Sequence, residues 1–171
     1  MVLPDDVRER VTSYIKHQAT KSPQAIIDLV SATQKRFLEI VAPLDDGIVA
    51  RQTAADEWSI HDLVRHVVSA ESGVAKLVHG LARGVRPDTG NLGIGSMVDG
   101  GSYGTLIEQL RAANAAILEA IATLPADPDT TTLAKHPFFG ELNCLEWAAF
   151  QRVHDTDHVQ HAEKILAAAR A

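Results

Sequence analysis

The sequence predicts an all-α protein, a four-helix bundle with a short extra N-terminal helix. Apolar residues recur at helical spacing along four long segments, each about 30 Å long at the rise of an α-helix. Aromatic residues make up only 5% of the chain while alanine and leucine are abundant, which favours helices over a β-sandwich. No segment has the alternating pattern of a strand. At 171 residues we expect a single domain over residues 1–171.

Local signals mark the beginnings of the first helices. The short N-terminal helix is expected over residues 4–19. Ser22 is a typical N-cap, and Pro23 follows at the first helical position, where its missing N–H is not needed. The next long helix is expected to begin at Ser59, because Asp62 stands three residues later as the partner of a capping box.

The last two helices carry similar signals. The third bundle helix is predicted over residues 102–124, with Thr105 and Glu108 as a capping box. Asn143 is expected to cap the fourth helix, with Glu146 as its reciprocal partner. This fourth helix then extends almost to the end of the sequence.

Two connections between helices are long. Residues 84–101 are rich in glycine, and we expect them to form a crossover between helices that run in the same direction and to line the mouth of a site. Residues 126–142 are predicted as a loop whose two phenylalanines fold back onto the end of the bundle. His136 in this loop is interpreted as structural. Cys144 is the only cysteine, so the chain cannot form an intrachain disulfide. We expect the Cys144 side chain to pack in the core as a small apolar group.

Charge and hydropathy exclude two classes of partner. The formal net charge is −6 and Lys and Arg form no cluster, which argues against nucleic-acid binding. No apolar run approaches the roughly 18 residues that a membrane span needs, and the first residues lack a signal-peptide pattern. We therefore expect a cytoplasmic protein whose partner is a small-molecule substrate.

One helix face near the C-terminus carries three histidines within an apolar stripe. Buried imidazoles cost free energy unless each ring nitrogen has a partner, so a shared metal ion is the economical explanation. His154 and His158 have the i, i+4 spacing that lets two side chains reach one cation, and His66 is the only histidine near the inner side of another helix. The face consists of Trp147, Phe150, His154, His158, His161 and Ile165.

Three neutral imidazoles with an open fourth position are typical of a catalytic zinc site. His161 could be a fourth ligand, replace one of the three, or hydrogen-bond to a ligand. Alternatively, the histidines form a hydrated polar seam without a metal. The segment HDTDH at residues 154–158 is similar to the HExxH motif of metalloproteases, but the carboxylate of Asp155 is one methylene too short to reach a metal-bound water. A di-iron bundle is also disfavoured, because the chain lacks paired Glu-x-x-His motifs. His61 and His79 are expected on the outer or inter-helix surface.

Two segments form a specific combination, EWSIHDLVRHV at residues 57–67 and HPFFGELNCLEWAAFQRVHDTDHVQHAEKI at residues 136–165. They resemble the DinB-like superfamily, which includes thiol-dependent S-transferases and the metal-binding domain of mycothiol-dependent maleylpyruvate isomerase. The resemblance implies an up-down-down-up bundle with a crossover after the second bundle helix, and zinc or nickel held by His66, His154 and His158. His161 occupies a position that usually holds glutamine. The two-domain isomerases have an additional C-terminal domain, whereas this sequence ends just after the fourth helix. We therefore do not expect it to catalyse their reaction.

Together these patterns predict a DinB-like metal-binding protein. We expect a divalent metal, zinc with nickel as the alternative, that activates a low-molecular-weight thiol or water toward a small electrophile, as in an S-transferase or hydrolase. The alternative is a non-catalytic, stress-related metal-binding bundle. A homodimer through the alanine-rich residues 112–122 and a monomer are both compatible with the sequence.

Overall fold

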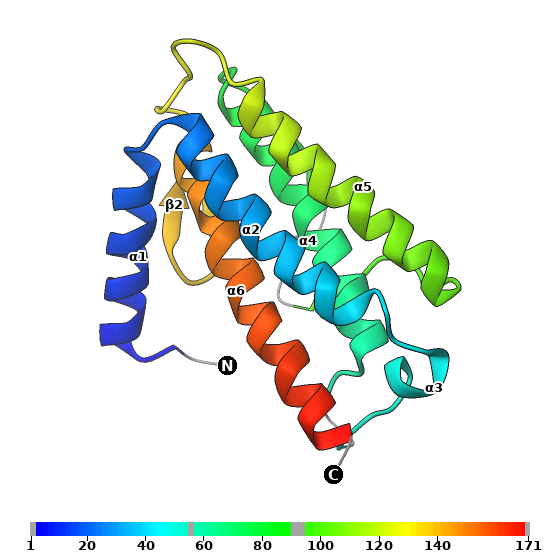
Figure 1. Cartoon of the computed structure of the whole chain (residues 1–171). Coiled ribbons are helices and arrows are strands. Elements are labelled where there is room, and N and C mark those ends of the chain that lie inside the picture. The colour runs from blue at the N-terminus through cyan, green and yellow to red at the C-terminus, as the bar shows by residue number, and fades with distance from the viewer. Residues whose placement is uncertain (1–2, 55–56, 90–94, 170–171) are drawn as a thin grey trace.

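The computed structural model describes residues 3–54, 57–89 and 95–169. Figure 1 shows long helices packed side by side, with a small hairpin at one end, which confirms the all-α class. In the described part of the chain the elements are α1 (Asp5–Ala19), α2 (Pro23–Val41), α3 (Asp46–Val49), α4 (Ile60–Leu81), α5 (Tyr103–Ala122), β1 (Ala134–His136), β2 (Gly140–Leu142) and α6 (Cys144–Ala169).

Contacts between helix ends establish the directions of the four bundle helices α2, α4, α5 and α6. The Arg36–Glu163 ion pair, 2.8 Å long, joins the C-terminal halves of α2 and α6, so these two run in parallel. The Arg83 side chain just after α4 donates to the carbonyl of Thr123 just after α5, so α4 and α5 also run in parallel. The predicted up-down-down-up arrangement is therefore confirmed (Figure 1).

The long connection after α4 returns along that helix to the beginning of α5. Val98 N donates to the carbonyl of Arg65, and Nε of Arg65 donates back to the carbonyl of Val98 at 2.8 Å. At the beginning of this connection the chain passes close to Gly80, where a Cβ atom would lie 2.8 Å from Cδ of Pro87. Residues 90–94, which include two of the glycines, lie outside the described residues.

The N-terminal helix α1 packs along the outside of the bundle, beside α6 (Figure 1). Ile15 is completely buried in that contact. Arg152 of α6 reaches the Tyr14 hydroxyl, and its guanidinium lies 5.6 Å from the centre of the Tyr14 ring. The predicted extra helix thus contacts the bundle through Ile15, with Val11 and Ala19 beside it, and through the contacts of Arg152 with Tyr14.

Most of the predicted helix caps are confirmed, and one is wrong. Ser59 and Asp62 form a capping box, and Asn143 and Glu146 bond reciprocally at the beginning of α6. The capping box predicted from Thr105 and Glu108 does not form at the beginning of α5. Instead Ser102, with extended backbone angles, accepts a hydrogen bond from Thr105 N, and Thr105 already lies within the first turn.

The loop over residues 126–142 contains a hairpin that the sequence did not indicate. Strands β1 and β2 pair antiparallel, with Ala134 opposite Leu142 and His136 opposite Gly140. Each strand has only three residues, too few for an alternating pattern to appear. Gly140 has φ +78°, a conformation that favours glycine, where the chain turns into β2. The prediction that this segment contains no strand was wrong because the two strands are too short to show a pattern.

The bundle core has two apolar parts with a polar layer between them. One part lies toward the hairpin end and includes Val74, Ile117 and Trp147, and the other lies toward the C-terminus of α6 and includes Leu63, Leu110 and Ile165. Between them, buried polar side chains come from all four bundle helices, namely Gln34, His66, Glu71, Asn114, Gln151, Asp155 and His158.

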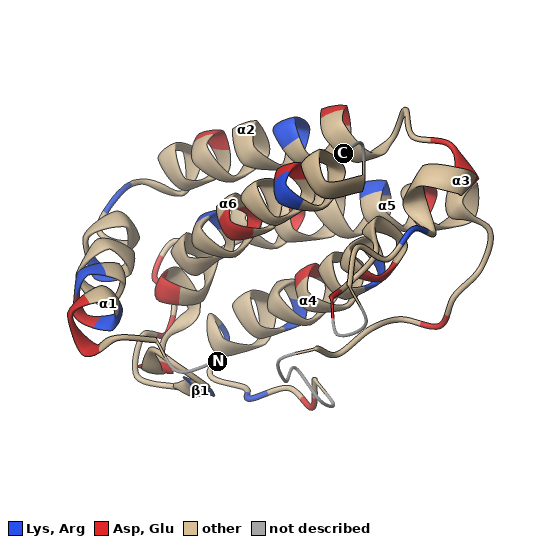
Figure 2. Ribbon diagram, turned by 90° about the horizontal axis from the view of Figure 1, so that it is seen from below, with Lys and Arg blue, Asp and Glu red and all other residues tan. Residues whose placement is uncertain are grey.

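Apart from Glu71 and Asp155, no Lys, Arg, Asp or Glu of the described residues is buried. Figure 2 shows Lys and Arg interspersed with Asp and Glu along α1, α2 and α6. Of the described helices, none is both long enough and apolar enough to cross a membrane.

Candidate metal centre

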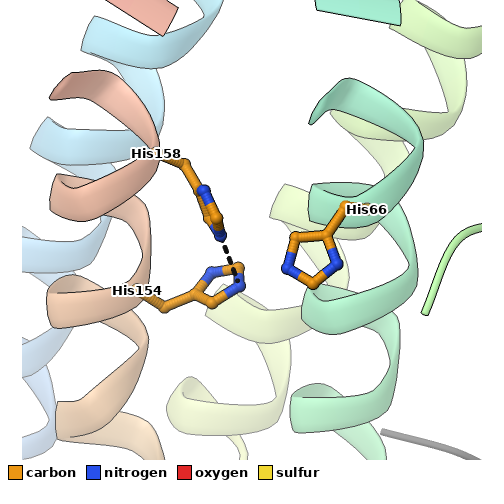
Figure 3. Close-up of side chains that lie close together, drawn as sticks. All are labelled: His66, His154 and His158. Carbon is orange, nitrogen blue, oxygen red and sulfur yellow. Dashed lines mark hydrogen bonds between the residues drawn. The ribbon is translucent and has the colours of Figure 1, made fainter. Parts of the chain in front are cut away.

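Three histidines from two helices face one another in the middle of the bundle. His66 comes from α4, and His154 and His158 come from α6 (Figure 3). Each ring offers one nitrogen, and these three nitrogens all lie within 4.8 Å of one another. The structure therefore brings together the three residues that the sequence proposed as ligands, and this group could hold a metal ion.

The pair on α6 has the separation that one tetrahedral ion requires. Nε2 of His158 lies 3.1 Å from Nε2 of His154. Zinc–nitrogen bonds of 2.0–2.1 Å in a tetrahedron place two ligand nitrogens about 3.3 Å apart. The three nitrogens lie within 4.8 Å of one another, so their largest separation exceeds 3.3 Å by at most about 1.5 Å. Small side-chain rotations can close this difference. The donor set therefore fits a tetrahedral ion with one position left open.

The crossover fixes the orientation of His66. Its Nδ1 lies 2.9 Å from the carbonyl oxygen of Ser96, which can only accept a hydrogen bond, so Nδ1 carries the hydrogen. Nε2 is thereby the nitrogen with a free lone pair. The ring also packs against Trp58, with ring centres 4.9 Å apart. As expected from the sequence, the connection between α4 and α5 contributes directly to the site.

A carboxylate next to His154 orients the second ring. Nδ1 of His154 lies 3.3 Å from Oδ1 of Asp155, so Nε2 is left facing His158. Metal-binding histidines commonly donate their other ring N–H to a carboxylate or carbonyl in this way. Nδ1 of His158 is buried and has no hydrogen-bond partner among the described residues.

Burial keeps the rings of His66 and His158 neutral at physiological pH. Desolvation, with a smaller contribution from His154, lowers the pKa of His66 to about 4. The pKa of His158 is lowered much further, again by burial first and then by His154 and His66. Neutral imidazoles are the form that binds metals, so His66 and His158 need not lose a proton before they bind an ion.

His161 lies beside the cluster. Its ring centre is 6.3 Å from that of His158, and the ring stacks on Trp58 at 5.9 Å with an angle of 25° between the planes. Burial lowers the pKa of His161, whereas the nearby Asp157 opposes that change. His161 and Trp58 thus flank the cluster as a stacked aromatic pair.

The remaining candidates have structural or surface positions. Nδ1 of His136 accepts hydrogen bonds from the backbone N–H groups of Phe138 and Phe139, and the ring packs against Phe150 at 4.4 Å. This agrees with the structural role predicted for His136. His79 is exposed, and His61 lies at the edge of the crossover.

The single cysteine is not positioned as a reactive thiol. Cys144 is completely buried, and its Sγ lies 3.4 Å from the carbonyl oxygen of Asp129. Burial raises the pKa of the thiol, which disfavours the nucleophilic thiolate. The expected packing role is confirmed.

The polar layer beside the histidines was missed by sequence reasoning. Glu71 is 1% exposed, Gln151 is fully buried and Asp155 is 3% exposed. Glu71 interrupts an otherwise apolar face of α4, whereas Gln151 and Asp155 stand one turn apart on α6. A polar residue at a core position does not identify the partners that it has on other helices.

Comparison with known proteins defines the family. The sequence profile of the DinB superfamily matches residues 29–162. The chain belongs to the DinB superfamily. No curated protein matches it. Among solved structures, TT2238, described as a four-helix bundle protein, is similar with a TM-score of 0.65 and 21% sequence identity, over 84% of this chain and 99% of that chain. This likeness supports the fold, and the family match includes all three clustered histidines of this DinB-superfamily protein.

Proposed function

We propose that this DinB-superfamily protein binds one divalent metal ion through His66, His154 and His158 and uses it on a small-molecule substrate. The observation that carries the proposal is the convergence of three ring nitrogens, from two buried histidines and the partly buried His154, within 4.8 Å of one another. Two of the rings have their second nitrogen fixed by Ser96 or Asp155, which leaves the other nitrogen available for a metal.

Zinc is the proposed ion, with nickel as the alternative. Imidazole nitrogen suits both metals, whereas hard cations such as magnesium prefer oxygen ligands. Three protein ligands leave one position for an exchangeable molecule, as in catalytic zinc sites. A bound metal would supply Lewis acidity, lowering the pKa of a bound water or thiol.

The protein's own residues orient the ligands and shield them from solvent. Ser96 and Asp155 select the ring tautomers of His66 and His154, and Trp58 covers one face of the His66 ring. His161 extends this aromatic surface. The position that the three ligands leave open suits a low-molecular-weight thiol or water, and we infer its reaction with a small electrophile, as in an S-transferase or hydrolase.

The test combines metal analysis with a thiol-conjugation assay. The wild-type protein is expected to hold one metal per chain and to accelerate conjugation of an electrophilic probe by glutathione, bacillithiol or mycothiol. His66→Ala should lose both properties. His79→Ala, which removes an exposed histidine of the same helix, is the matched control and should keep them. Zinc-loaded protein that turns over none of the thiols and hydrolyses no ester probe would contradict the enzymatic proposal.

Deep burial of the ligands favours a second candidate, a non-catalytic metal-binding bundle. His66 is 7% exposed and His158 8% exposed, which also suits an ion that stabilises the fold. In that case removing the metal should lower the melting temperature substantially while no probe is converted. An enzyme should show turnover that disappears with the metal and returns when zinc is restored.

A further inference from the structure

Part of the connection between α4 and α5 lies along α4 as a strap, which we define as residues 95–101. Nε2 of His61 lies 3.4 Å from the carbonyl oxygen of Gly101. Two turns further along the helix, the Ser69 hydroxyl donates to the Ser96 hydroxyl at 3.3 Å. The strap therefore runs in the direction opposite to α4. The residues of α4 that contact it in this way stand four apart and so form one row on the helix surface, namely His61, Arg65 and Ser69.

Arg65, in the middle of this row, holds the strap through two hydrogen bonds to one residue. Its Nε donates to the Val98 carbonyl at 2.8 Å, and its own backbone carbonyl accepts from Val98 N at 3.3 Å. The guanidinium also lies 3.4 Å from Oδ1 of Asp62, whose other oxygen accepts from the Ser59 hydroxyl at the beginning of α4. The Arg65 side chain is therefore held from α4 while it holds the strap.

The strap carries the hydrogen-bond acceptor that orients His66. The Ser96 carbonyl, two residues before Val98, faces Nδ1 of His66 at 2.9 Å. Two residues of extended chain span at most about 7 Å, so a strap fixed at Val98 leaves the Ser96 carbonyl little freedom to move away from the ring. Without that acceptor, either nitrogen of His66 could carry the hydrogen and either could face the cluster. The position of the strap therefore decides which nitrogen of His66 faces His154 and His158.

We propose that Arg65 is a positioning residue for the metal centre. Through Val98 it holds the strap against α4, and the Ser96 carbonyl of the strap then keeps Nε2 of His66 directed toward the two histidines of α6. Arg65 is not one of the three ligands, and it acts on the site through the backbone of the strap. This inference rests on the proposed metal binding, and its experiment separates the two.

The decisive comparison is between two replacements of Arg65 that match its side chain as far as Nε. The amide nitrogen of Arg65→Gln is bonded to Cδ, as Nε is in arginine, so it can still donate to the Val98 carbonyl. Arg65→Met has a methyl group at that place and offers no donor. We expect Arg65→Gln to bind zinc within about threefold of the wild type, and Arg65→Met to bind about 10-fold more weakly, the lower end of the usual loss when a partner behind a metal ligand is removed.

Two NMR measurements on the metal-free protein distinguish positioning from a general loss of stability. The Val98 amide should exchange its hydrogen faster in Arg65→Met than in the wild type, while the amides within α4 keep their rates, because only the strap is released. His66 should be protonated at Nδ1 in the wild type and in Arg65→Gln, and should be a mixture of tautomers in Arg65→Met.

Arg83→Met is the matched control for the loss of an arginine. Arg83 also donates to two backbone carbonyls, but at the other end of α4. It stands 17 residues after His66, which corresponds to about 25 Å along a helix. We expect Arg83→Met to leave the zinc affinity, the His66 tautomer and the Val98 exchange rate unchanged.

Each outcome decides one statement. Weaker zinc binding, mixed His66 tautomers and faster Val98 exchange in Arg65→Met alone support the positioning role. Wild-type zinc affinity and His66 tautomer in Arg65→Met, whether or not the strap is released, overturn that role and leave the metal site intact. Equal losses in Arg65→Gln and Arg65→Met also overturn it, because the Gln variant keeps the donor to Val98.

Two further results keep the inference testable. A wild-type protein that binds no zinc overturns the metal site and this inference with it. Should Arg65→Met fail to fold, Arg65→Lys replaces it, since lysine keeps the charge but has a methylene in place of Nε. Wild-type zinc affinity and an unchanged His66 tautomer in Arg65→Lys would then overturn the positioning role.

Discussion

Acid should destabilise the metal-free protein well above the pH at which carboxylates titrate. Burial lowers the pKa of His66 and of His136 to about 4 and that of His158 further. In the unfolded chain each of these histidines has its ordinary pKa of about 6.5. Between these values the unfolded state binds protons that the folded state does not, so the free energy of unfolding falls as pH is lowered.

The magnitude follows from the number of groups. Each neutral buried histidine contributes about 1.4 kcal/mol per pH unit once the pH is well below 6.5, and three such histidines contribute about 4 kcal/mol per unit. Glu71 has the opposite effect above pH 4.5, because its raised pKa keeps a proton in the folded state, and it offsets about one histidine. Because the unfolded histidines are half protonated at pH 6.5 already, the net loss between pH 6.5 and pH 5 is then about 3 kcal/mol, a large fraction of typical domain stability.

Urea denaturation of dialysed, metal-free protein at half-unit steps from pH 6.5 to pH 5 measures this slope. His136→Phe should reduce it by about 1.4 kcal/mol per pH unit, because His136 lies outside the histidine cluster and its loss removes one titrating group. His79→Ala, at an exposed position, should leave the slope unchanged. Stability that is constant or rises on acidification over this range would refute the assignment of buried, neutral histidines.

Further predictions concern single side chains. His161→Gln should keep zinc affinity within a few fold, because the His161 ring lies beside the cluster, and a loss near 100-fold in a competition titration would make it a ligand. Leu110→Ala should cost about 2–5 kcal/mol in urea denaturation, since Leu110 is completely buried. Ser59→Ala should cost about 1 kcal/mol through loss of the capping box. Cys144 should react with a thiol reagent only at the rate of unfolding, and rapid labelling of the native protein would contradict its burial.

The fold was largely predictable because its signals are local. Ser22, Ser59 and Asn143 mark helix beginnings through hydrogen bonds within one turn, and such bonds depend on few other residues. The error at Thr105 has the same origin, since Ser102 and Thr105 both carry hydroxyls and only the backbone angles decide which one caps. The hairpin was missed because its pairing depends on two three-residue segments too short for periodicity.

The candidate site was predictable only in part. His154 and His158 share a helix, so their spacing alone places them together. His66 could be proposed because it is the one histidine outside the fourth bundle helix that the sequence places near the inner side of a helix. The carbonyl of Ser96, which orients His66, comes from a distant part of the chain. Contacts of this kind depend on how the helices pack, and no single segment encodes them.

X-ray absorption spectroscopy of the zinc-loaded protein tests the central claim most directly. The geometry predicts three imidazole nitrogens at 2.0–2.1 Å from the metal, together with one exchangeable light atom. His158→Ala should lower the number of imidazole ligands, and His79→Ala should leave it unchanged. A zinc environment without imidazole scattering, or one unaffected by His158→Ala, would contradict the metal centre proposed for this bundle.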